Sequence, residues 1–129
     1  LEEAFKWYRK AADQGEPRAQ FQVGLMLSLG MGVPKDGVDA ARWFMKAAHQ
    51  GNTDAQILLA SCYLNGDGVP EDTVAAYAWF NLASASGDES AKRSKAETAK
   101  AMTKEQIAEA QKLSRKLYDE IEKRKSKGK

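Results

Sequence analysis

Apolar residues recur along the chain at helical spacing, and this pattern itself returns in successive copies. Tryptophan marks the repeat, because its three occurrences are 36 positions apart. In the middle copy Trp43, Phe44 and Ala47 fall on one face of a helix, as buried residues do. The pattern predicts two helices in each of two copies, over about 17–29 and 37–50, and over about 53–65 and 73–86.

Glycine, proline and short polar residues stand where these helices should begin and end. Gly30 and Gly66 follow predicted helices, where glycine readily takes the left-handed conformation of a C-cap. Pro17 occupies a first helical position, where its missing N–H is not needed. Three of the predicted helices are preceded by residues whose side chains can accept from free N–H groups: Asp36, Asn52 and Asp72.

The loop between the paired helices, GMGVPKD at 30–36, has paired glycines beside a lysine, as a phosphate-binding loop has. In a phosphate loop, however, the glycines precede a helix and the lysine lies at the start of that helix. The second copy, GDGVPED at 66–72, carries Glu71 at the position of Lys35. A phosphate ligand would not tolerate this reversal of charge, so we interpret both loops as turns with capping residues.

The predicted architecture is all-α, a solenoid of antiparallel helix pairs with about seven helices and a C-terminal capping helix. One helix pair cannot bury its own apolar face, so neighbouring pairs stack. We expect a single domain over residues 1–122. It divides into a half repeat, two full repeats, a degenerate repeat helix and a capping helix, at residues 1–15, 16–51, 52–87, 88–101 and 103–122.

The end of the chain carries the signature of a cap. Thr103 and Gln106 form a capping box, in which each side chain bonds the backbone of the other. The helix that follows has one apolar face with Tyr118 beside it: Ile107, Ala110, Leu113, Leu117 and Ile121. A partner helix for dimerisation is the alternative role. Residues 123–129, KRKSKGK, are predicted to be a disordered basic tail.

Charge and composition exclude several functional classes. The 129 residues carry a net charge of +2, but five of the 20 basic residues lie in 123–129, so residues 1–122 hold 15 basic against 18 acidic residues. A body with a net charge of −3 is not a nucleic-acid-binding surface. No uncharged run reaches the length of a membrane span. The single cysteine excludes an internal disulfide, and a soluble protein of the cytoplasm or periplasm fits both facts.

No constellation of residues in the sequence predicts catalysis or a cofactor. His49 aligns with Asp13 and Ala85 in the other copies, so the packing of the repeat does not require it, and we expect it on the surface. A zinc site needs about four ligands, which His49 and Cys62 do not supply. Cys62 stands in a helix at the place of Met26, which indicates packing as a small apolar residue. We predict a protein without enzymatic activity, metal or cofactor.

The repeat resembles the Sel-one-like repeat family, relatives of the tetratricopeptide repeats. The first copy carries the resemblance through AQFQVG at 19–24, the loop 30–36, and the residues Ala-x-x-Trp-Phe-x-Lys-Ala-Ala at 40–48. One departure is Ala60, which stands where the first copy has Gly24. Bacterial and other members commonly act as adaptors that assemble protein complexes, so the resemblance implies a protein or peptide partner.

The predicted binding surface is the concave face that the first helix of each pair lines. Its residues vary between the copies at helical spacing: Phe21, Leu25 and Ser28, and Ile57, Ser61 and Leu64, with Gln20 and Gln56 as polar neighbours. The alternative for Phe21 and Ile57 is core between the repeats. A regulatory or targeting module of a longer protein is the alternative function. Because the chain starts within a repeat, we expect a fragment, monomeric unless exposed terminal helices pair.

Overall fold

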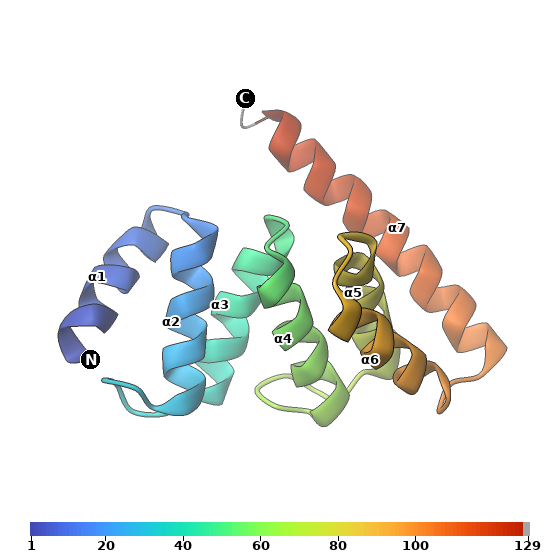
Figure 1. Cartoon of the computed structure of the whole chain (residues 1–129), viewed down its shortest axis with the longest axis horizontal. Helices are drawn as coiled ribbons and strands as arrows, with labels where there is room; N and C mark the ends of the chain where they lie inside the picture. The colour runs from blue at the N-terminus through green and yellow to red at the C-terminus, as the bar shows by residue number, and fades with distance from the viewer. Residues whose placement is uncertain (128–129) are drawn as a thin grey trace.

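The computed structural model describes residues 1–127, which form seven α-helices and no strand. The helices follow one another from α1 at one end of an array to α5 and α6 at the other, and α7 crosses obliquely at that end (Figure 1). This confirms the predicted all-α solenoid. The helices are α1 (Glu2–Asp13), α2 (Pro17–Leu29), α3 (Gly37–His49), α4 (Thr53–Asn65), α5 (Thr73–Ala85), α6 (Glu89–Ala99) and α7 (Lys104–Lys127).

The helices form pairs that stack. Helices α2 and α3 are one pair and α4 and α5 the next, and each second helix also contacts the first helix of the following pair. Helix α1 packs on α2 as the second helix of a preceding pair would, and α6 packs on α5 as the first helix of a third pair. The array therefore places α2, α4 and α6 in equivalent positions.

Side chains outside the helices satisfy their free N–H groups. The side-chain oxygens of Asp36 and Asp72 accept from the N–H groups of Asp39 and Ala75 at 3.0 Å. Asn52 accepts from the N–H of Ala55 at 2.8 Å in the same way. Helices α2 and α4 end at left-handed glycines, as predicted.

The second glycine of each loop lets neighbouring repeats approach backbone to backbone. Gly68 has a φ of +76° and lies against the carbonyl group of Gly37 at the start of α3. Gly32, its equivalent, has a φ of +74°, and a Cβ there would lie 2.6 Å from the carbonyl oxygen of Leu1. The loops are thus contact points between repeats, which explains why glycine occurs twice in each.

Alanine and aromatic residues fill the space between the helices. The alanines at the helix contacts, such as Ala47 and Ala76, are fully buried and let the helix axes approach closely. Trp43 and Trp79 are 5% and 4% exposed, as expected of core residues. The equivalent Trp7 is 67% exposed. It lies on α1, and no helix within residues 1–127 covers it as α1 covers Trp43, whose ring lies 5.1 Å from the Arg9 guanidinium.

Helix α7 leaves the regular path of the array. It packs on α5 and reaches α3, instead of pairing with α6. The turn before it, residues 100–103, has no glycine, and Lys100 keeps right-handed helical geometry with φ −60° and ψ −29°. The predicted capping box is present, with bonds of 2.9 and 3.1 Å between Thr103 and Gln106.

The apolar face of α7 covers the second helices of two pairs. Its Ala110, Leu117 and Ile121 are buried, and Ile107 and Leu113 are half-buried, whereas Tyr118 is exposed. The sequence did not indicate the buried Ser114, whose hydroxyl accepts from the Asn81 amide of α5 at 2.7 Å. This face fits the role of a capping helix better than that of a free dimerisation surface.

The structure differs from the prediction of a disordered tail at 123–129. Helix α7 continues to Lys127, and residues 128–129 lie outside the described part of the chain. Basic side chains in a last helical turn interact favourably with the helix dipole. Lys125 pairs with Glu122 at 3.7 Å, and its aliphatic stem lies beside Gly51. The basic residues thus extend the helix.

Candidate protein-binding surface

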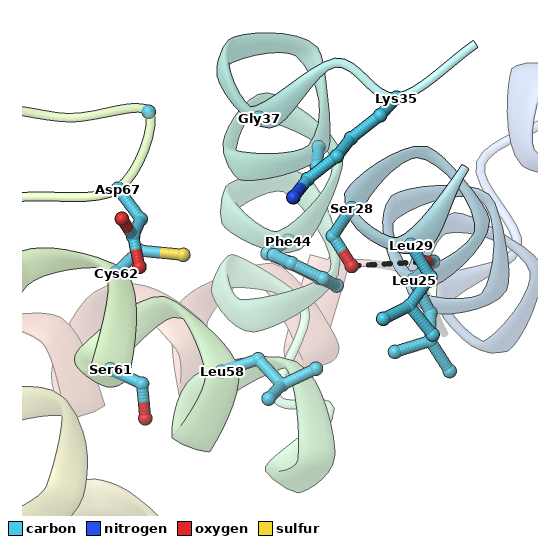
Figure 2. Close-up of a pocket in the computed structure, with 12 residues that line it drawn as sticks. Leu25, Ser28, Leu29, Lys35, Gly37, Phe44, Leu58, Ser61, Cys62 and Asp67 are labelled. Atoms are coloured by element: carbon cyan, nitrogen blue, oxygen red, sulfur yellow. Dashed lines mark hydrogen bonds between the residues drawn. The ribbon is translucent and has the colours of Figure 1, made fainter. Parts of the chain in front are cut away.

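A cavity of about 420 Å³ opens between α2 and α4. Phe44, which α3 supplies, is 2% exposed and closes its floor. Figure 2 shows the side chains that surround the opening. The walls are mainly apolar and come from α2 and α4: Leu25, Ser28, Leu29, Leu58, Ser61 and Cys62. We call this the first cavity.

A second cavity of about 470 Å³ lies at the equivalent place between α4 and α6. Its floor is Phe80, the repeat equivalent of Phe44, and Ser61 lines both cavities. Its other walls are more polar: Leu64, Glu71, Thr73, Arg93, Ser94, Glu97 and Thr98. The repeat therefore makes two cavities of one design with different linings, side by side on the face formed by α2, α4 and α6.

Two charged loop residues flank the first cavity. Lys35 comes from the loop after α2 and Asp67 from the loop after α4. Figure 2 shows the Lys35 ammonium extending over the opening above Phe44, with Asp67 on the opposite wall beside Cys62. Neither side chain belongs to any of the four ion pairs found in residues 1–127. Both residues are also exposed, so both charges face solvent at the opening.

Four of the eight residues predicted for the groove line these cavities. Leu25 and Ser28 line the first cavity, Leu64 lines the second, and Ser61 lines both. Phe21 and Ile57 are half-buried against the core, and the Phe21 ring lies 6.1 Å from that of Phe44. These surroundings agree with the alternative interpretation, in which both residues belong to the core between the repeats.

The two predicted glutamines are buried, 5% and 4% exposed, and connect helices. Gln20 donates to the carbonyl of Ala12 at 3.3 Å and accepts from the Gln50 amide at 2.7 Å. Gln56 donates to the carbonyl of Ala48 at 3.2 Å. Each joins a first helix to the end of the helix before it, so its amide N–H is already used within the fold.

Several residues at the first cavity were missed by sequence reasoning. Leu29 and Leu58 lie one helical turn from Leu25 and Ser61, so helical spacing alone was sufficient to find them. Lys35 and Asp67 belong to loops, where helical spacing gives no signal. The only indication in the sequence that Lys35 has a role in binding was that Glu71, with the opposite charge, occupies the equivalent position of the next repeat.

Histidine, cysteine and acidic side chains do not gather at one place in the described part of the chain. Within residues 1–127 no cluster of three or more histidine, cysteine or acidic side chains is placed to hold a metal ion. Burial, and after it the negative charge of Asp67, raises the pKa of the Cys62 thiol. A nucleophilic cysteine needs a lowered pKa, so Cys62 is a wall residue of the first cavity.

His49 is half-buried, which differs from the expected surface position. Its ring meets the Trp79 ring edge-on, with centroids 5.1 Å apart. Burial lowers the pKa of His49 below its ordinary value of 6.5, Arg124 of α7 lowers it further, and Glu120 opposes them. The sequence could not show that Arg124 and Glu120 lie near His49, because α7 is distant in the chain.

Stability is expected to depend on pH through His49. Its pKa is lower in the folded than in the unfolded state, so the unfolded chain takes up the proton first as pH falls. The free energy of unfolding should therefore decrease as pH falls through about 6.5. Urea unfolding of the wild type and of His49→Gln at about pH 7.5 and 5.5 measures this. The variant should lose less stability on acidification; equal losses would contradict the assignment.

Comparison with known proteins agrees with this architecture. The model of the Sel1 repeat matches residues 1–16, 17–52 and 53–88, more than half of the chain. The chain belongs to the Sel1 repeat family. Proteins of this family are helical repeat scaffolds that typically mediate protein interactions. No curated protein matches the chain.

Two solved structures of Sel1-like repeat proteins are similar to this chain. One is c5321, described as a protective antigen in uropathogenic Escherichia coli strains displaying an SLR fold, with 40% identity and a TM-score of 0.90 over 93% of this chain. The other is a Sel1 repeat protein from Oxalobacter formigenes, with 35% identity and a TM-score of 0.71 over 73% of this chain. This Sel1 repeat chain spans 26% and 39% of their respective lengths. In residues 1–127 no helix combines the length and hydropathy of a membrane span.

Proposed function

We propose that this Sel1 repeat chain is a non-catalytic adaptor that binds a segment of another protein across α2, α4 and α6. The observation that carries the proposal is the first cavity, with its apolar walls, its floor at Phe44 and its equivalent one repeat further. Ligand pockets are typically apolar concavities with a few polar groups at fixed places. Successive cavities on one face suit an extended partner segment better than a small molecule.

The hydroxyl groups in these walls favour apolar contact. Ser28 donates to the carbonyl of Leu25 at 2.8 Å, and Ser61 donates to that of Ile57 at 3.1 Å. Because both hydroxyls bond their own helix, the walls of the first cavity expose little unsatisfied polarity to a ligand. The buried glutamines keep the helices in place, and the cavity walls make the contact. On a solenoid this face is the expected concave surface.

The proposal is tested by a substitution that places a charge at the first cavity and leaves the core residues unchanged. Leu29 lines the first cavity and is 61% exposed, so Leu29→Glu should fold. A carboxylate at an apolar contact should weaken partner binding at least about tenfold, which corresponds to about 1.4 kcal/mol. Proteins captured from a lysate of the source organism are quantified by mass spectrometry for wild type and variant.

The control is Tyr118→Glu, which introduces the same charge at another exposed apolar residue, on α7. It should retain the proteins that the wild type captures. Leu25→Glu combined with Leu64→Glu spoils both cavities, and circular dichroism checks its fold. Capture of the same proteins by wild type, Leu29→Glu and a folded double variant would contradict the proposed face.

A further inference from the structure

We propose that the first cavity selects a peptide segment in which an aliphatic side chain lies next to a carboxylate. The aliphatic side chain enters the cavity, and the carboxylate pairs with Lys35 at its opening. This inference rests on the proposed function, because it names the chemistry of the partner segment for the same face.

The apolar requirement follows from the walls. Leucines from both α2 and α4 face the cavity, and the ring of Phe44 closes it from below. A charged or polar side chain there would lose its hydration without gaining a hydrogen bond, which is unfavourable. An aliphatic side chain would instead remove the apolar walls from water.

The charge requirement follows from Lys35. Its ammonium extends over the opening, and it has no acidic partner among residues 1–127. A ligand carboxylate at the opening would lie within its reach. Asp67, on the opposite wall, is an acceptor for backbone N–H groups of the same segment. The opening thus offers one cation and one acceptor to a single peptide.

The repeat shows that the fold does not dictate this charge. A Cβ on Gly30 would lie 3.5 Å from the Cβ of Lys35, and a Cβ on Gly66 would lie 3.5 Å from that of Glu71. The two loops therefore hold the two side chains in the same way, although their charges are opposite. Each lines its own cavity, Lys35 the first and Glu71 the second. Lys35 is thus free to serve recognition.

The test uses a library of random peptides displayed on phage as the probe. Wild-type protein should enrich sequences with an aliphatic residue beside Asp or Glu. Lys35→Glu should enrich an aliphatic residue beside Lys or Arg, because like charges at a contact suppress wrong partners. The best wild-type peptide should bind Lys35→Glu at least about tenfold more weakly by calorimetry.

Two further variants separate the inference from the proposed function. Lys112→Glu makes the same charge change on the exposed surface of α7 and should select as the wild type does. If Leu29→Glu abolished enrichment while Lys35→Glu selected the wild-type sequences, the face would bind peptides but the charge rule would be wrong. If wild type enriched no sequence, or if enrichment survived Leu29→Glu unchanged, the proposed face would fall together with the inference.

Discussion

Gly68→Ala is expected to lower the free energy of unfolding by about 2–5 kcal/mol. The left-handed conformation costs a residue with a Cβ about 1–2 kcal/mol. Overpacking adds about 1–3 kcal/mol, because the new Cβ would overlap the carbonyl oxygen of Gly37, a backbone atom that cannot turn aside. Urea unfolding followed by circular dichroism measures the loss.

Gly37→Ala is the matched control, because it makes the same substitution on the other side of the same contact. A Cβ on Gly37 would meet no atom within 4 Å. Its φ is not positive, and alanine is the better helix former. Gly37→Ala should therefore be neutral or slightly stabilising. Equal losses in the two variants would contradict a specific role for the second glycine of the loop.

Trp79→Ala should lower the free energy of unfolding by about 3–5 kcal/mol, the usual cost of removing a large buried aromatic side chain. Trp79 is 4% exposed, lies in the central cluster and contacts His49 edge-on. Its removal leaves a cavity between α3 and α5 that the surrounding helices cannot fill. Chemical denaturation with tryptophan fluorescence measures the change.

Trp7→Ala is the natural comparison, because it makes the same change at the equivalent position of the repeat. Its effect should stay below about 1 kcal/mol, since a surface substitution removes little packing. The Trp7 ring has the Lys10 ammonium near it, 5.7 Å from the ring centroid. A large loss for Trp7→Ala would mean that the ring is covered in solution, for instance by a second copy of the chain.

The repeating pattern predicted most of the fold because each element is specified locally. Prolines, glycines and capping residues fix the helix ends, so the predicted starts at Pro17 and Thr53 agree with the structure. The course of α7 was not predictable in this way. Its periodicity defines an apolar face but does not say which helices that face covers, and the turn at 100–103 sends it onto α5 and α3.

The candidate site was predicted only in part for the same reason. Variation between the copies pointed to Leu25, Ser61 and neighbours on the first helices, which do line cavities. It could not separate a side chain that lines a cavity from a buried one such as Gln20, since both lie on the inner side of one helix. The charges of Lys35 and Asp67 depend on the path of loops, which periodicity does not describe.

The oblique course of α7 has a consequence for how the molecule unfolds. In a simple solenoid each unit interacts only with its neighbours, so stability spreads along the array as in a one-dimensional chain of coupled units. Helix α7 adds a contact that skips a unit, because it touches both α5 and α3. The C-terminal units therefore open together, whereas α1, which within residues 1–127 packs mainly on α2, opens first. In native-state hydrogen exchange, the protection of the amide protons should therefore rise from the N-terminus and level off from α3 onward.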